Sequence, residues 1–235
     1  MILGQPNLVC KIEGDLEIRV GGCTIKHSSV IRNIGTMLDS EMKMLDQVHN
    51  VCRSCYASLN SLGRIRKYFC DSSMEILVHA FITCKVDNLN SLLSGIPDYA
   101  LHRVQMALNN SSRLLTRTDS KDHITPVLKE LHWLPVEARI DYKILLLTYK
   151  ALNGFGPVYI RELLHLKQHK RETRSSRDFL MLEVPRTRLK TLGDRSFSFT
   201  AATHWNALPL ELRSVPSLSV FKQQLKTFLF KRSYS

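Results

Sequence analysis

The sequence has no long apolar run, and this absence excludes a membrane span. Its longest purely apolar stretches are a few residues, such as Ile144 to Leu147, whereas a transmembrane helix needs about 20. The first residues, MILGQPNLVCKIEGD, also lack the positive and apolar regions of a secretory signal. We therefore expect an intracellular protein, nuclear or cytoplasmic, with no membrane partner.

The sequence also lacks the carboxylate pairs of metal-dependent catalysis. A polymerase holds two metal ions between carboxylates, and no Asp-Asp or Asp-x-Asp pair occurs. Asp119 and Asp122 are three residues apart, and we interpret them as a polar loop that leads into a helix. Neither a GxxxxGK[ST] or GxGxxG phosphate loop nor a GxSxG nucleophile elbow is present. We predict no catalytic residue and no enzyme activity.

Metal-ligand patterns are equally weak. The six cysteines stand at positions 10, 23, 52, 55, 70 and 84, and in a reducing compartment they are more often buried apolar side chains than disulfides. Cys52 and Cys55 have the spacing of half a zinc site, but no second half follows at a suitable distance, so we predict both in a helix core. His165 and His169 are interpreted as solvated side chains beside a basic run. The sequence predicts no metal site and no cofactor.

Positive charge is in excess, and the excess lies in one part of the chain. The 33 basic and 21 acidic residues give a net charge of +12. Residues 1–100 hold 10 of each sign, whereas residues 101–235 hold 23 basic and 11 acidic residues. A one-sided basic excess is typical of a protein that binds a polyanion, and an ordinary solvated surface is the alternative.

The densest basic segments supply the candidate phosphate contacts. Arg113 and Arg117 are four residues apart near a predicted helix end, where they also complement the helix dipole. The expected contacts to RNA or DNA backbone, made without sequence reading, are Arg113, Arg117, Arg174, Arg177, Arg186, Arg188, Lys190 and Arg195. A protein partner is the alternative.

Local patterns predict strands first and helices afterwards. Alternating residues predict strands over 16–20, 23–25 and 30–34, with a hairpin turn at Gly21-Gly22. Three- and four-residue spacing predicts an amphipathic helix over 43–67. A capping box from Ser72 to Glu75 predicts another through residue 93, which Gly95 ends.

The second half reads as further short helices. Pro97 suits the first turn of a helix through Leu115. Further helices are expected from Thr125-Pro126 to about 132, from Pro135 to Asn153-Gly154, over 157–166, and after Ser217. A small hairpin or an irregular basic arm is expected near 178–190. Trp133 and Trp205 stand among apolar or small residues and are predicted in the core.

Nine short boxes occur in order between residues 40 and 230. They are Asn50-Val51-Cys52-Arg53, Leu77-Val78-His79-Ala80-Phe81, Arg113-Leu114-Leu115-Thr116, Asp122-His123-Ile124-Thr125-Pro126-Val127-Leu128, Leu131-His132-Trp133-Leu134-Pro135-Val136, Lys150-Ala151-Leu152-Asn153-Gly154, Val184-Pro185-Arg186-Thr187-Arg188-Leu189-Lys190, Trp205-Asn206-Ala207-Leu208-Pro209 and Phe221-Lys222. In this order they resemble the region after the polymerase palm in LINE-type (non-LTR) retrotransposon reverse transcriptases. Gly156, Val158 and Cys55 depart from the family's pattern.

The resemblance implies a mainly α fold in four parts. Residues 1–40 would be palm-edge strands of an incomplete domain, ending in a variant of the family's Leu-Gly-Val turn at Ile34-Gly35-Thr36. Residues 41–118 would be a helical thumb-like region, 119–166 a helical region, and 167–235 a basic arm with a second small hairpin near 178–190 and a C-terminal helix.

The resemblance also implies a function. The family's catalytic aspartates would precede Met1, so the chain is expected to be a C-terminal fragment of an RNA-directed DNA polymerase. Such a fragment lacks the catalytic carboxylates and binds RNA or DNA backbone nonspecifically. The alternatives are a helical protein-interaction module and a degenerate element copy with no selected function.

Overall fold

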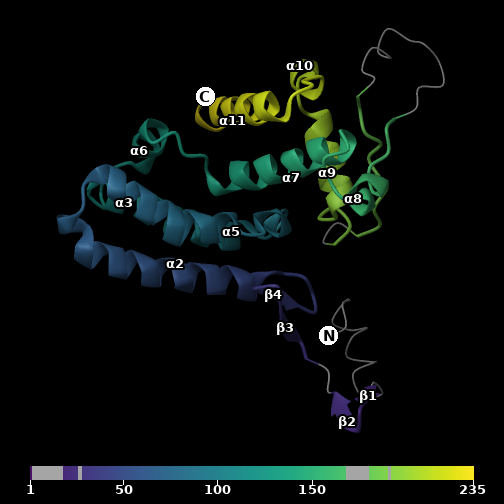
Figure 1. Ribbon diagram of the computed structural model, residues 1–235, viewed down its shortest axis with the longest axis horizontal. Coiled ribbons are helices and arrows are strands. Elements are labelled where there is room, and N and C mark those ends of the chain that lie inside the picture. The colour runs from purple at the N-terminus through teal and green to yellow at the C-terminus, as the bar shows by residue number, and fades with distance from the viewer. Residues whose placement is uncertain (2–17, 26–27, 168–179, 190–191) are drawn as a thin grey trace. The chain divides into compact units, whose positions relative to one another are not determined.

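The computed structural model describes Met1 and residues 18–25, 28–167, 180–189 and 192–235, and it is mainly helical. The predicted fold class is therefore confirmed. The chain forms two compact units, whose elements Figure 1 labels. The first unit comprises Met1–Leu89 and Ile96–Leu115, and the second comprises Asn90–Gly95 and Thr116–Ser235.

The first unit begins with two antiparallel strand pairs. The pairs are β1 (Ile18–Val20) with β2 (Cys23–Ile25), and β3 (Val30–Asn33) with β4 (Thr36–Asp39). The predicted strands are confirmed within the described residues, whereas residues 16 and 17 lie outside them. The sequence did not predict β4.

Each strand pair closes through a two-residue turn. Gly21 and Gly22 have φ angles of 56° and 81°, the left-handed conformation that a tight hairpin turn requires and glycine adopts without strain. The second turn, predicted from the resemblance, has Ile34 at φ 46° and Gly35 at φ 85°. A β-branched residue is disfavoured there, so the turn at Ile34 is held by the pairing of β3 with β4.

The helix predicted over 43–67 is present as α2 (Leu45–Ile65), followed by the 3-10 turn η1 (Arg66–Tyr68). Val48, Cys52 and Cys55 are buried at steps of four and three residues, and Leu62 is buried two turns further on. Gln47 is also buried, and its Oε1 accepts a hydrogen bond from the Met37 amide at 2.9 Å. This bond ties β4 to α2.

The next predicted helix, from the capping box through residue 93, is interrupted. The chain forms α3 (Asp71–Val78), the π-helical segment η2 (His79–Thr83) and α4 (Cys84–Asp87). The capping-box prediction is wrong, because α3 begins at Asp71 and has no side-chain cap. A separate 3-10 turn, η3 (Asn90–Leu93), belongs to the second unit.

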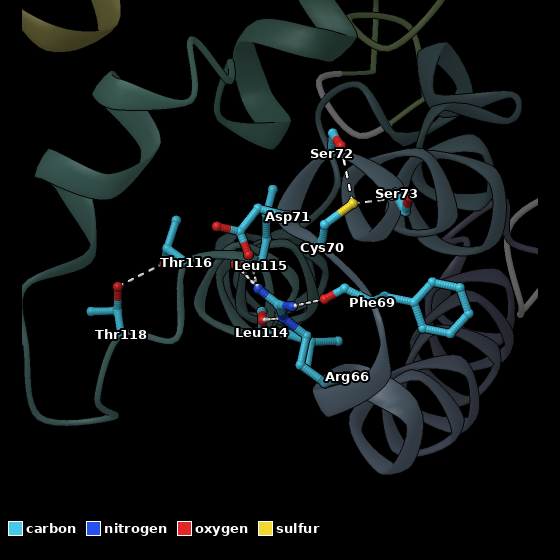
Figure 2. A network of polar contacts seen from close by, with 10 residues as sticks. All are labelled: Arg66, Phe69, Cys70, Asp71, Ser72, Ser73, Leu114, Leu115, Thr116 and Thr118. Atoms are coloured by element: carbon cyan, nitrogen blue, oxygen red, sulfur yellow. Dashed lines mark hydrogen bonds and ion pairs between the residues drawn. The ribbon is translucent and has the colours of Figure 1, made fainter.

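Arg66 joins three segments of the first unit (Figure 2). It is 8% exposed, and its guanidinium donates to the carbonyl oxygens of Leu114 and Leu115 at 3.0 and 2.9 Å. Those carbonyls lie in the last turn of α5 (Asp98–Thr116), where a cation also complements the helix dipole. The same side chain pairs with Asp71 at the start of α3. Arg66 thus links α2, α3 and α5.

The second unit is built around one long helix. Its helices are α6 (Ile124–Glu130), α7 (Val136–Leu152), α8 (Val158–Glu162), α9 (Phe197–Asn206), α10 (Leu210–Arg213) and α11 (Leu218–Tyr234). α7 packs against both α9 and α11, and Figure 1 shows α11 lying along α7. The helices predicted from Pro135 and after Ser217 are confirmed, whereas the one predicted over 157–166 is helical only over Val158–Glu162. Helices α9 and α10 were not predicted. The helix predicted from Thr125 begins at Ile124 instead, with His123 at the N-cap position and no side-chain capping hydrogen bond.

Aromatic side chains fill the centre of this unit. The rings of Tyr149 and Phe221 are stacked with centroids 4.1 Å apart, and Trp205 lies 6.1 Å from Phe221. Trp133 and Trp205 are 4% and 1% exposed, which confirms that both belong to the core. The Tyr149 hydroxyl donates to the Val215 carbonyl at 2.8 Å, so its polar end has a partner.

One local motif occurs twice in the second unit. Pro135 precedes α7 and Pro209 precedes α10, each with φ near −57°. Four residues after each proline an arginine folds back: Arg139 Nε donates to the Leu134 carbonyl at 2.8 Å, and Arg213 Nε donates to the Leu208 carbonyl at 3.1 Å. Proline suits this position because it has no amide to leave unpaired. Both arginines therefore stabilise helix starts.

The segment near 178–190 pairs differently from the predicted hairpin. Leu182 forms an antiparallel bridge with Leu166, and the described residues 180–189 form no strand pair among themselves. The side-chain amide of Asn206 accepts from the Leu182 amide and donates to the Leu182 carbonyl, both at 2.8 Å. Asn206 thus occupies the edge of Leu182 that a second hairpin strand would need.

Candidate nucleic-acid interface

The eight basic residues chosen from the sequence have different surroundings. Arg113 lies half-buried on α5 in the first unit, and Arg117 is exposed in the second unit at φ 58°. Both arginines lie near the end of α5, as predicted, but Arg117 is just beyond its last residue. Arg186 and Arg188 are exposed, and Arg195 is half-buried. Arg174, Arg177 and Lys190 lie outside the described residues.

Arg186 and Arg188 are presented by a loop that closes on itself. The Thr187 hydroxyl between them donates to the Asp194 carboxylate, and the Gly193 amide donates to the Leu189 carbonyl at 2.7 Å. A Cβ on Gly193 would lie 2.6 Å from that carbonyl oxygen and 2.7 Å from the Thr187 Cβ, so the loop closes only around glycine. Arg186 and Arg188, on either side of Thr187, are both exposed to solvent.

Arg195 follows that loop but is held by the protein. Its Nε donates to the Ser94 carbonyl at 3.0 Å, and its Cγ lies 2.7 Å from where a Cβ of Gly95 would stand. Gly95 has φ +68°, which suits glycine and leaves room for the arginine stem. Arg195 therefore anchors the loop to the 90–95 segment of the same unit.

Several other cations serve the fold. Arg139 and Arg213 support helix starts, and Arg232 pairs with the buried Asp141. The His204 Nδ1 lies 3.4 Å from the other oxygen of Asp141. This cluster links α7, α9 and α11, so Arg232 is less available to a ligand than its exposed neighbours.

α11 carries further cations that were not among the candidates predicted from the sequence. The helix contains Lys222, Lys226, Lys231 and Arg232 and no acidic residue. The three lysines are exposed. The signal was readable from the sequence as a helix-long excess of one charge, with four cations and no acidic residue in 17 positions.

The acidic residues and cysteines considered as metal ligands have contacts that belong to the fold. The Asp119 carboxylate accepts from the Lys121 amide at 3.0 Å and from the Ser120 hydroxyl at 3.2 Å, which confirms a polar loop. Cys52 and Cys55 are buried on α2, as predicted for core residues. In the described ranges, no three His, Cys, Asp or Glu side chains gather as a metal site would require. His169 lies outside these ranges.

Cys70 is the one described cysteine whose surroundings favour the thiolate. It precedes α3, and its Sγ lies 3.3 Å from the Ser72 hydroxyl and 3.2 Å from the Ser73 hydroxyl (Figure 2). These hydrogen bonds lower the pKa of the exposed Cys70 thiol to about 7. Burial acts in the opposite direction at Cys55 and raises its pKa to about 11.

None of the helices in the described ranges combines the length and apolar character that a bilayer span requires. Comparison of the chain with protein-family models, with curated proteins and with solved structures finds no match.

Proposed function

We propose that this chain is the region that follows the palm in a LINE-type (non-LTR) retrotransposon reverse transcriptase, and that it binds RNA or DNA through the phosphate backbone without polymerase activity of its own. The observation that carries the binding proposal is electrostatic. The whole charge excess lies in residues 101–235, and there Arg186 and Arg188 are exposed on a closed loop.

The family assignment rests on the nine boxes, and their structural roles support it. The box around Trp133 and Pro135 begins α7, and the box at 205–209 holds Leu182 through Asn206 and begins α10. Asn153 and Gly154 end α7, with Gly154 at φ 76°. Boxes that start, stop and join helices are those expected of a shared fold rather than of a shared active site.

Phosphate binding follows from the chemistry of the exposed arginines. A guanidinium donates two parallel hydrogen bonds to a phosphate, and binding releases the counterions condensed on the nucleic acid. Contacts of this kind carry no sequence information. The expected activity is therefore nonspecific and salt-dependent binding, whereas polymerisation would require paired metal-binding aspartates, and no Asp-Asp or Asp-x-Asp occurs in the sequence.

Binding to an RNA–DNA hybrid tests this function. The fluorescence anisotropy of a labelled hybrid would be measured with the whole chain at about 50 mM and about 200 mM salt. The expected result is binding that weakens strongly at the higher salt. Absence of binding at low salt by a chain with a helical circular-dichroism spectrum contradicts the proposal.

One observation favours protein binding as a second candidate function. α8 has no buried residue, and Val158 and Tyr159 are 70% and 66% exposed, with Phe155 at 60% just before them. Exposed apolar side chains of this kind commonly mark an interaction surface. A purely protein-binding module predicts no salt-dependent affinity for the hybrid, so the same titration separates the two functions.

A further inference from the structure

α11 carries a row of basic and aromatic side chains along one side. Its buried side consists of Phe221, Leu225 and Leu229. Lys222, Lys226, Phe230 and Tyr234 repeat every four residues, so they follow one another along a single ridge. At 1.5 Å per residue this ridge is about 18 Å long.

The far end of the ridge is extended by residues at the end of α6. His132 stacks on Phe230 with ring centroids 5.6 Å apart and an interplanar angle of 16°. Phe230 contacts Tyr234 edge-on at 4.8 Å, and the Lys129 Nζ lies 5.6 Å from the Tyr234 ring centroid. Lys129 and His132 are exposed. The ridge therefore runs from two lysines to a cluster of three rings and a third lysine.

His132 is held in an unusual backbone conformation. Its φ is +54°, and the Trp133 amide donates to the Leu128 carbonyl at 2.9 Å. This is the position after a helix where glycine is the usual residue. The His132 Nδ1 also lies 3.0 Å from the Glu130 carbonyl oxygen, which orients the ring. The chain thus has an oriented, exposed imidazole ring at a position where the backbone conformation favours glycine.

We propose that this ridge binds a single-stranded segment of RNA or DNA, with phosphates on Lys222, Lys226 and Lys129 and an unpaired base stacked on His132. The proposal rests on the proposed function and adds a second contact surface to the Arg186–Arg188 loop. Lysines that follow a backbone beside a ring that accepts a base are the usual means of binding single strands. A base inside a duplex is already stacked on its neighbours, so the ring favours single strands.

An acidic peptide could also pair with the lysines, but its carboxylates would make no favourable contact with the aromatic rings. Carboxylates gain little from the face of an aromatic ring, whereas every base has a π-face. Single-stranded nucleic acid is therefore the partner whose chemistry matches both parts of the ridge.

Two variants test the two parts of the ridge separately. The double variant Lys222→Gln and Lys226→Gln removes the charges, and glutamine keeps nearly the helix propensity of lysine. The variant His132→Gly removes the ring but places the preferred residue at the left-handed position, so the fold is retained or stabilised. The matched control is Lys121→Gln with Lys167→Gln, two exposed lysines that are not part of the ridge.

The measurement is the anisotropy of a labelled single strand of about 12 nucleotides, with an RNA–DNA hybrid as the second ligand. Removing Lys222 and Lys226 is expected to reduce the slope of log affinity against log salt for the single strand by about 1.4. The control variant is expected to reduce that slope by less. His132→Gly is expected to weaken single-strand binding about fivefold to a hundredfold and to leave hybrid binding unchanged.

Each outcome decides the proposal. Single-strand affinity unchanged in His132→Gly, or a lysine variant no weaker than its control, overturns the ridge while hybrid binding through Arg186 and Arg188 still stands. Competition by polyglutamate equal to that by the oligonucleotide also overturns it. If the unaltered chain binds neither ligand, both the ridge and the proposed function are overturned.

Discussion

The Arg195 side chain lies directly over the backbone of Gly95. The Arg195 Cγ is 2.7 Å from the place where a Cβ of Gly95 would stand, and the Arg195 Nε donates to the neighbouring Ser94 carbonyl at 3.0 Å. An arginine that sequence analysis assigned to phosphate binding thus holds two distant segments of the second unit together. Its contribution is expected to be to stability rather than to binding.

Gly95→Ala is expected to lower the free energy of unfolding by about 1–3 kcal/mol, because alanine meets both the left-handed backbone and the arginine stem. Gly154→Ala is the matched control, since Gly154 has φ +76° with no atom within 4 Å of its Cβ position. Urea titration would measure both. In an Arg195→Ala background, the loss of stability from Gly95→Ala should fall to that from Gly154→Ala. Equal losses of stability from the two glycine substitutions in the unaltered chain would contradict this account.

The Arg186–Arg188 loop gives a prediction on salt dependence. Replacing both arginines with alanine is expected to reduce the slope of log affinity against log salt for a hybrid by about 2, since each duplex phosphate contact contributes about 0.9. Lys43→Ala with Lys67→Ala removes two exposed charges from the first unit and serves as the control. An equal change in slope for both variants would contradict specific phosphate contacts by Arg186 and Arg188, because it would show that binding depends on total charge alone.

Asn206→Ala tests the side-chain amide that replaces a strand partner. Leu182 is 1% exposed, and both of its backbone polar groups bond to Asn206. Leaving them unpaired is expected to cost about 2–4 kcal/mol of stability. Thr203→Ala, at an exposed position on the same helix, should cost far less. Equal denaturation midpoints for the two variants would contradict a stabilising role for the hydrogen bonds between Asn206 and the Leu182 backbone.

Cys70 gives a prediction on pH. Hydrogen bonds from Ser72 and Ser73 lower the pKa of its thiol from 9.0 to about 7. The thiolate is the reactive form, so alkylation of Cys70 should reach half its maximal rate near pH 7, and Ser72→Ala with Ser73→Ala should shift that midpoint upward. Peptide mapping after iodoacetamide treatment resolves each cysteine. A midpoint for Cys70 near 9 would refute the hydrogen-bond account, and the buried Cys55 should stay unreacted.

Sequence periodicity predicted the elements whose packing is one-sided. At three- and four-residue intervals, α2 buries Val48, Cys52 and Cys55, and α11 buries Phe221, Leu225 and Leu229. Periodicity did not predict α9, because its buried residues include small ones such as Ala201 and Ala202. The serines and threonines beside them are weak helix formers. Its position depends on packing against α7, which local sequence does not encode.

The candidate site was predictable as a charged region but not residue by residue. Arg186 and Arg195 look alike in sequence, yet one is exposed and the other donates to a carbonyl 101 positions away. The helix-start arginines, Arg139 and Arg213, are likewise defined by a carbonyl five residues earlier that only the turn geometry brings near. The contact of Arg195 to a backbone carbonyl leaves no signature in residue type.

Lysine footprinting on the whole chain tests the central claim most directly, namely that nucleic acid lies on the C-terminal basic surface. The chain would be acetylated with and without saturating RNA–DNA hybrid at low salt, and each lysine would be followed by mass spectrometry. The account predicts protection of exposed lysines within Thr116–Ser235, with Lys43 and Lys67 of the first unit unchanged. Equal protection of Lys43 and Lys67, or no protection anywhere, would contradict it.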